Sequence, residues 1–154
     1  MLLSAFFAAC ALATPFTLDE PPPVEVDPFE WAATASPVEA DAGGNITLRL
    51  VIPPSHFVYR DRVSIDVVDP AGLLIGEVML PPGELRPDVG QDLPDREQYA
   101  SDVFFTIPLS AAQTTTDGLA QVSLEVRHQG CRPGLCFPPT TTPLTALVPV
   151  RTSD

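Results

Sequence analysis

The sequence predicts an all-β fold, an antiparallel sandwich of seven or eight short strands. Three observations lead to this prediction. Apolar and polar residues alternate in several segments, as they do in strands that bury one face. Turn signals separate these segments, and 19 prolines among 154 residues disfavour long helices. The hydrophobic content of 45% is typical of a globular domain rather than a disordered chain.

The first 28 residues are expected to precede the domain. Met1–Ala13 is uncharged and mostly apolar, and we interpret it as a secretory signal peptide. Within it, Phe7-Ala8-Ala9-Cys10 is similar to a bacterial lipoprotein box, so acylation of Cys10 is the alternative to its removal. Thr14–Pro28 is acidic and rich in proline, which predicts an extended arm. We therefore expect an exported protein whose folded domain covers residues 29–151.

The domain is predicted to begin with Phe29–Ser36, which contains Trp31, the only tryptophan and an expected core residue. Pro37–Gly44 is expected to be a turn region, and Pro81–Asp95 the longest irregular loop. A loop of this length in a compact domain is often functional. The other expected strands follow in chain order: Asn45–Ile52, Val63–Val68, Leu73–Leu80, Ser101–Leu109, Leu119–His128 and Leu144–Val150.

Alternation also predicts which side chains face the core. The expected core residues are Ile46, Leu48, Leu50 and Ile52; Val63, Ile65 and Val67; Val103, Phe105 and Ile107; and Val122, Leu124 and Val126. His128 continues the last series, so we expect a packed or surface histidine rather than a general base, whereas His56 follows two prolines and is expected to be exposed.

Charge excludes two classes of partner. The net charge is −12, and all eight basic residues are arginines. A chain this acidic is repelled by nucleic acid and by anionic lipid headgroups, so we expect neither as a partner.

Two cysteines remain in the predicted domain, Cys131 and Cys136, with a Pro133-Gly134 turn between them. The residues alone leave three interpretations open. A structural disulfide across so short a loop would contribute about 2 kcal/mol. A metal site could use both cysteines with His128 and His56, although the spacing matches no common zinc pattern. A redox couple is the third interpretation, because a short surface loop can be reduced without unfolding the domain.

Motifs around the cysteines favour the redox interpretation. Val126-Arg127-His128-Gln129-Gly130-Cys131 is followed by Gly134-Leu135-Cys136-Phe137-Pro138-Pro139. Two weaker motifs, Phe57-Val58-Tyr59-Arg60 and Leu80-Pro81-Pro82-Gly83, precede them. In type and order, these motifs resemble the N-terminal periplasmic domain of the DsbD family of thiol:disulfide interchange proteins. The resemblance covers about Pro28 to Val150.

This resemblance implies an immunoglobulin-like sandwich in the periplasm. It implies that Cys136 attacks a client disulfide and that Cys131 resolves the mixed disulfide. Four further residues would lie near the pair: Phe57, Tyr59, Gln129 and Phe137. Electrons would come from a membrane electron-transfer protein through a thioredoxin-like donor. They would pass to periplasmic oxidoreductases such as a disulfide isomerase or cytochrome-maturation thiol proteins. No metal or other cofactor is expected.

The chain departs from the family pattern in three ways. The spacer of four residues between the cysteines is one shorter than in the best-known members. The expected cap loop, Asp88-Val89-Gly90, contains no aromatic residue. The sequence also contains no membrane or thioredoxin-like part, so the electron donor is expected to be a separate polypeptide.

The local sequence predicts thiol pKa values near or above the free value of about 8.5, because no helix N-terminus is expected beside the cysteines. From another functional class, the alternative is a non-catalytic immunoglobulin-like binding module with a structural disulfide.

Overall fold

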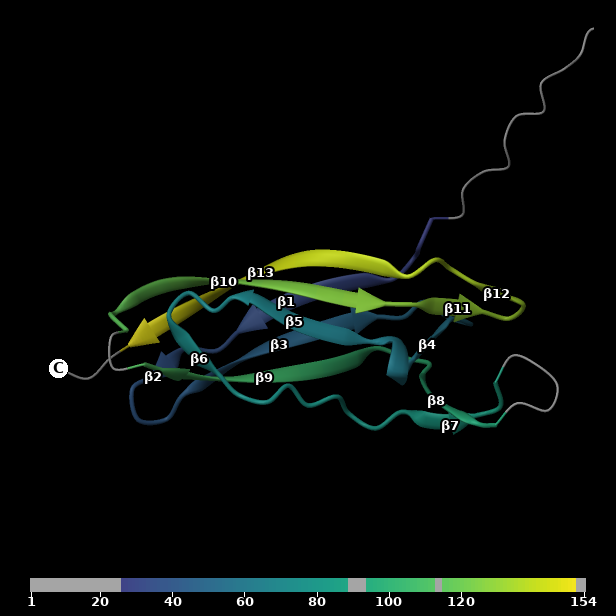
Figure 1. Cartoon of the computed structure of the whole chain (residues 1–154), viewed down its shortest axis with the longest axis horizontal. Helices are drawn as coiled ribbons and strands as arrows, with labels where there is room; N and C mark the ends of the chain where they lie inside the picture. The colour runs from purple at the N-terminus through teal and green to yellow at the C-terminus, as the bar shows by residue number, and fades with distance from the viewer. Residues whose placement is uncertain (1–25, 89–93, 113–114, 152–154) are drawn as a thin grey trace, which may run out of the picture.

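The computed structural model describes residues 26–88, 94–112 and 115–151. They form an elongated, immunoglobulin-like β-sandwich (Figure 1). The first sheet has the strand order β1 (Glu30–Ala35), β3 (Gly44–Val51), β9 (Val103–Ala111) and β6 (Leu73–Ile75). The second has the order β2 (Val38–Glu39), β13 (Thr140–Arg151), β10 (Gly118–His128) and β5 (Ser64–Asp69). All strand pairs within these two sheets are antiparallel except β2 with β13.

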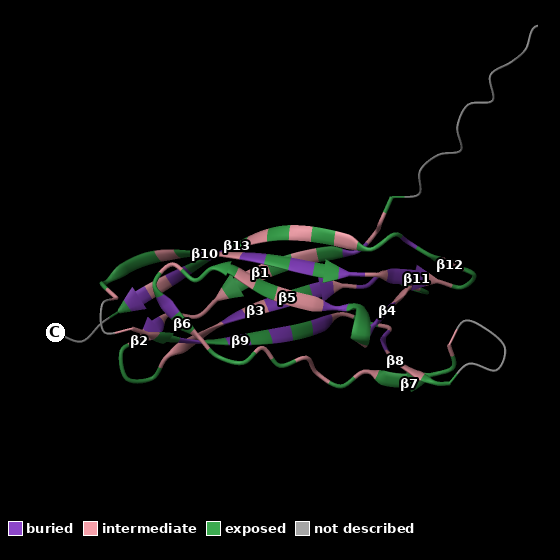
Figure 2. Cartoon of the chain, viewed as in Figure 1, coloured by how far each residue is buried: buried purple, intermediate pink, exposed green. Residues whose placement is uncertain are grey.

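The core fills the space between these two sheets, and buried and exposed residues alternate along several of their strands in Figure 2. Three predicted series are confirmed, on β3 and the residue after it, on β9 and on β10: Ile46, Leu48, Leu50 and Ile52; Val103, Phe105 and Ile107; and Val122, Leu124 and Val126. On β5 the burial is weaker, since Ile65 and Val67 are only half-buried. Trp31 is also half-buried and contacts the ring of Phe105.

A third sheet lies at the end of the sandwich away from the end of β13 (Figure 1). Its order is β12 (Leu135–Cys136), β11 (Gly130–Arg132), β4 (Phe57–Tyr59), β8 (Arg96–Tyr99) and β7 (Glu84–Arg86). A short 3₁₀ helix, η1 (Arg60–Arg62), follows β4. β10 pairs with β13 along its whole length, from Gly118 to His128, and β11 begins two residues later. The longest ladder of the fold therefore fixes the start of the segment that carries the cysteines.

Two predicted elements are wrong in extent. The strand expected at Leu73–Leu80 ends at Ile75, and beyond it only Met79 forms an isolated bridge with β9. The cause lies in β9, where the Pro108 carbonyl accepts the Gly76 amide hydrogen but proline has no N–H to return. The last strand begins at Thr140 rather than Leu144.

Two segments expected to be irregular contain strands. The turn region Pro37–Gly44 includes β2, and the loop Pro81–Asp95 includes β7. Neighbouring β8 was also not predicted. Both β7 and β8 are short and rich in charged residues, so their pattern carries no apolar alternation.

Residues 1–25, which hold the expected signal peptide, Cys10 and most of the predicted arm, lie outside the described residues. Within the described ranges, no helix has the length and apolar character needed to cross a bilayer.

Asp102 ties the first sheet to the segment after β3. Its carboxylate accepts hydrogen bonds from the Arg49 guanidinium and from the Ile52 amide, and these two interactions lower its pKa. A carboxylate with a lowered pKa in the folded state stabilises the fold above its unfolded pKa, and this contribution is lost as the pH falls through the folded pKa.

Asp102→Asn is therefore expected to lower the melting temperature at pH 7, and the difference from wild type should shrink as the pH falls below about 4. Thermal unfolding followed by circular dichroism between neutral and acidic pH measures this. A difference that stays constant over the whole pH range would contradict the assignment.

Candidate redox site

The two cysteines lie opposite each other in a tight hairpin. Cys131 in β11 is the register partner of Cys136 in β12, and a disulfide joins them with a Cα–Cα distance of 4.0 Å. The turn between them contains Gly134 at a φ of +80°, a conformation that favours glycine. The Pro133-Gly134 turn predicted from the sequence thus brings the two sulfurs together.

The two cysteines differ sharply in exposure. Cys131 has 0% relative exposure and lies opposite Phe57 of β4, whereas Cys136 is exposed on β12. β12 is the edge strand of its sheet, so only β11 covers it on the side of its backbone hydrogen bonds. A reacting molecule can therefore approach Cys136 more readily than Cys131.

The base of the hairpin is closed by residues on both sides of the cysteines. The Gln129 side chain donates a hydrogen bond to the Phe137 carbonyl at 3.2 Å, and the Phe137 amide donates to the Gly130 carbonyl at 2.9 Å. The ring of Phe29 lies against Gly130, where an added Cβ would be 1.9 Å from a ring carbon. Gly130 is therefore required by close packing rather than by its backbone conformation.

His128 belongs to the core beneath the hairpin. It is 1% exposed, and Trp31 Nε1 donates a hydrogen bond to its Nδ1 at 3.1 Å, so Nε2 carries the hydrogen of the neutral ring. Nε2 lies 3.0 Å from Asp27 Oδ2, close enough for an ion pair but not aligned as a hydrogen bond. Because its ring is buried and its Nδ1 accepts the hydrogen bond from Trp31, His128 is a packed residue, as its alternation predicts.

His56 differs from its prediction. It is half-buried rather than exposed, because its ring stacks on Phe137 and contacts the edge of Phe29. The described residues contain no group of His, Cys, Asp and Glu arranged to hold a metal ion.

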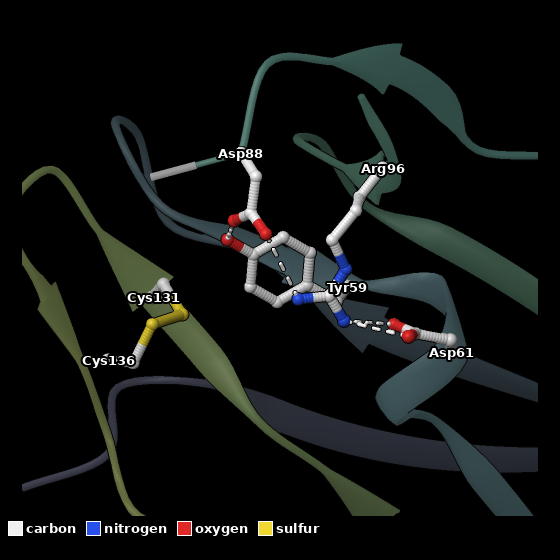
Figure 3. A network of polar contacts seen from close by, with 6 residues as sticks. All are labelled: Tyr59, Asp61, Asp88, Arg96, Cys131 and Cys136. Carbon is white, nitrogen blue, oxygen red and sulfur yellow. Dashed lines mark hydrogen bonds and ion pairs between the residues drawn. A yellow bond between two sulfur atoms is a disulfide. The ribbon is translucent and has the colours of Figure 1, made fainter. Parts of the chain in front are cut away.

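A network of polar side chains lies beside the disulfide (Figure 3). The Tyr59 hydroxyl donates to the Asp88 carboxylate, and the Arg96 guanidinium lies 3.8 Å above the centre of the Tyr59 ring. Arg96 also contacts Asp88 at 3.5 Å and both carboxylate oxygens of Asp61 at 2.7 Å. Partial burial lowers the pKa of Arg96, but the hydrogen bond and charge of Asp61 and the charge of Asp88 outweigh it and raise the pKa above its usual value.

This network borders a hollow beside the exposed sulfur. The hollow has a volume of about 290 Å³, and its lining includes Tyr59, Asp88, Arg96, Gln129 and Cys136. Its walls expose polar and apolar atoms about equally, and Leu135 supplies an apolar side chain next to the cysteine.

The two weaker sequence motifs meet in space. Arg60 donates hydrogen bonds from Nε to the Pro81 carbonyl at 2.9 Å and from Nη2 to the Leu80 carbonyl at 3.0 Å. The Tyr99 hydroxyl donates to the same Pro81 carbonyl at 2.6 Å, and burial raises the pKa of Tyr99. Arg60 thus fixes the start of the segment that leads to Asp88.

Arg60→Met is expected to lower the free energy of unfolding by about 1–2 kcal/mol, because it leaves two carbonyls without their charged donor. Urea unfolding measures the change. Arg62→Met is the matched control, since Arg62 is exposed and makes no hydrogen bond among the described residues. Equal destabilisation by both variants would show that the Arg60 hydrogen bonds contribute little.

The structure brings together the residues expected near the pair. Phe57 pairs with Cys131, Tyr59 and Gln129 line the hollow at Cys136, and Phe137 follows Cys136 at the base of the hairpin. Of the expected cap loop, Asp88 contacts Tyr59, whereas Val89 and Gly90 lie outside the described residues.

Three residues of the site were missed. From the sequence, Phe29 is only the predicted first residue of the domain, and Asp61 and Arg96 carry no predicted role. Arg96 belongs to β8, a strand that the sequence pattern does not predict. Asp61 joins the network through its hydrogen bonds with Arg96. The sequence contains no local signal that pairs them.

A family model described as "Thiol:disulfide interchange protein DsbD, N-terminal" matches residues 24–147. The chain belongs to this DsbD N-terminal family. Two curated relatives come from Pseudomonas aeruginosa. The chain is 36% identical over 107 residues to "Thiol:disulfide interchange protein DsbD 1" and 31% identical over 102 residues to "DsbD 2". These matches cover 68% and 66% of the chain but only 16% and 15% of the relatives, so the chain corresponds to about one sixth of their length.

Solved structures of DsbD N-terminal domains share the fold. The reduced domain from Neisseria meningitidis matches with a TM-score of 0.50 and 24% identity, over 71% of this chain and 80% of that one. A structure of the complex between the DsbD N-terminal and PilB N-terminal domains of the same organism matches with a TM-score of 0.51 and 21% identity, over 75% and 80%. The predicted immunoglobulin-like fold and the predicted family are confirmed.

Proposed function

We propose that this protein is a periplasmic thiol-disulfide exchange module that passes reducing equivalents through Cys131 and Cys136. Membership of the DsbD N-terminal family supports a role in thiol:disulfide interchange. The observation that carries the proposal is the unequal pair, in which an exposed cysteine is bonded to a buried one in a short hairpin at the edge of a sheet. The bond joins two strands of the third sheet and links neither of the two sheets that enclose the core.

The exchange proceeds in two balanced steps. The thiolate of reduced Cys136 attacks one sulfur of a client disulfide, and the other client sulfur leaves as a thiolate that takes up a proton. The Cys131 thiol then gives up its proton and attacks the Cys136 sulfur, so the first client sulfur leaves as a thiolate. The client is reduced to a dithiol, and the module is oxidised to its disulfide.

A reduced dithiol partner restores the module by the same steps in reverse. We assign this role to a thioredoxin-like donor that receives electrons from a membrane electron-transfer protein. The clients are periplasmic oxidoreductases, such as a disulfide isomerase or a cytochrome-maturation thiol protein. The complex of a related domain with a PilB N-terminal domain supports partners that are themselves proteins.

The thiols are expected to be weakly acidic. The cysteines lie in strands, with no helix N-terminus beside them in the described residues, and the nearby Arg96 is already engaged by Asp61 and Asp88. Their pKa values should therefore lie near or above about 8.5, so docking rather than thiol acidity sets the rate. Measured thiol pKa values below about 6 would contradict this part of the proposal.

The decisive experiment separates a redox couple from a structural disulfide in a binding module. The purified protein is equilibrated with glutathione buffers and with a thioredoxin, and the peptides that contain Cys131 and Cys136 are tested for alkylation by mass spectrometry. Reversible gain of two thiols with an unchanged circular dichroism spectrum is the expected result. A disulfide that is reduced only when the domain unfolds would favour the non-catalytic binding module.

A further inference from the structure

The arginines of this acidic chain gather around the cysteine hairpin. All but two of the eight, Arg49 and Arg151, lie on the third sheet, on η1 or at the end of β10. In a chain with a net charge of −12, this end is therefore where an anionic group of a partner would meet most of the cationic side chains.

Most of these arginines are used inside the domain. Arg60 contacts Glu97, Arg86 contacts Glu84, and Arg96 contacts Asp61 and Asp88. Arg62 and Arg127 differ: both are exposed, and neither forms an ion pair within the described residues. Their charges remain available to a partner.

These two arginines share one hollow. Arg127 is the register partner of Ser64, the first residue of β5, and Arg62 ends the 3₁₀ helix just before that strand. Together they line a hollow of about 370 Å³. Asp61 and Gln129 also line it.

The arginine hollow continues to the exposed sulfur. Arg62 and Gln129 line both the arginine hollow and the hollow beside Cys136. In the part of the chain that the structure describes, the nearby carboxylates form no ion pair with these two arginines. Asp61 is held by Arg96. Glu125 and Asp66 are register partners, and Glu125 lies two residues before Arg127 on β10. The two adjoining hollows, here together called the groove, thus connect Arg62 and Arg127 to the exposed cysteine.

We propose that this groove is a specificity site for a partner protein that carries an acidic side chain beside its reactive cysteine. When the partner sulfur meets Cys136, its carboxylate lies in the arginine hollow against Arg62 and Arg127. The rest of the surface, which is strongly acidic, repels partners with negative charge elsewhere, so the two arginines select the docking orientation. This inference rests on the proposed exchange function.

The test uses short peptides with a single cysteine held as a mixed disulfide with thionitrobenzoate. In one peptide, glutamates lie two to four residues from the cysteine; matched peptides carry glutamine or lysine at the same places. The reduced protein attacks the peptide sulfur and releases thionitrobenzoate, whose absorbance gives the second-order rate constant. At low ionic strength, we expect the glutamate peptide to react roughly three- to tenfold faster than the lysine peptide, and high salt should remove the difference.

Charge variants assign this preference to the groove. R62Q/R127Q is expected to lose the preference and to react with the three peptides at similar rates. R49Q/R151Q, matched in net charge, is the control and should keep the preference, because both residues lie away from the hairpin. An unchanged preference in R62Q/R127Q, or its equal loss in the control, would overturn the specificity site. Failure of the reduced wild-type protein to react with any peptide would instead contradict the exchange function itself.

Discussion

Cys136→Ser is expected to reduce the rate of exchange with a protein or peptide disulfide by about two orders of magnitude or more. Serine cannot form the mixed disulfide, and the remaining thiol, Cys131, is fully buried against β4. Cys131→Ser is expected to behave differently. It keeps the exposed nucleophile, so it should form a mixed disulfide at a rate close to that of wild type and then fail to resolve it.

Mass spectrometry of quenched reactions distinguishes the two variants, since only C131S should accumulate a covalent adduct. The two variants control each other for stability, because each loses the same disulfide and about the same 2 kcal/mol of loop-closure stabilisation. Adducts that accumulate equally on both variants would contradict the assignment of separate roles to the buried and exposed cysteines.

Alternation identified the core strands because each of them buries one complete face. On β3 and β9, every second residue from Ile46 to Leu50 and from Val103 to Leu109 is buried, and the sequence pattern reflects this directly. The third sheet has no such pattern. β7 is exposed throughout, and β8 buries only Gln98 and Tyr99. These two strands form through backbone pairing, β8 with β4 and β7 with β8, rather than through an apolar face of their own.

The site could be predicted where its residues are adjacent in the sequence. The hairpin from Gln129 to Phe137 is such a segment, and the family motif identified it. Contacts across long sequence separations were not predictable. Arg96 reaches Asp61, 35 residues away, and Phe29 reaches Gly130 through packing alone. The unequal exposure of the cysteines also depends on β4, which covers Cys131 and leaves Cys136 at the edge.

Gly130→Ala is expected to be among the most destabilising single changes in the domain. The new Cβ would lie 1.9 Å from Cε2 and 2.1 Å from Cζ of the Phe29 ring, closer than any real contact. Phe29 is 8% exposed and touches the rings of His56, His128 and Phe137, so it cannot move aside without disturbing them. We expect a loss of about 2–4 kcal/mol in the free energy of unfolding, measured by urea denaturation.

Substitution of Phe29, the residue that the new Cβ would clash with, gives a sharper test. Phe29→Ala alone should also destabilise the domain, by about 3 kcal/mol, because it removes a buried ring. In the double variant F29A/G130A, however, the Cβ at position 130 enters the space left by the ring. The double variant should therefore lose less free energy of unfolding than the two single variants lose together, by at least about 1 kcal/mol. Gly134→Ala, in the same hairpin but with open space around its Cβ, should cost only the roughly 1 kcal/mol of its positive φ. Strictly additive losses at positions 29 and 130 would show that the hairpin is not held by this contact. In that case, the hydrogen bond from the Gln129 side chain to the Phe137 carbonyl would be the main contact that holds the cysteine hairpin.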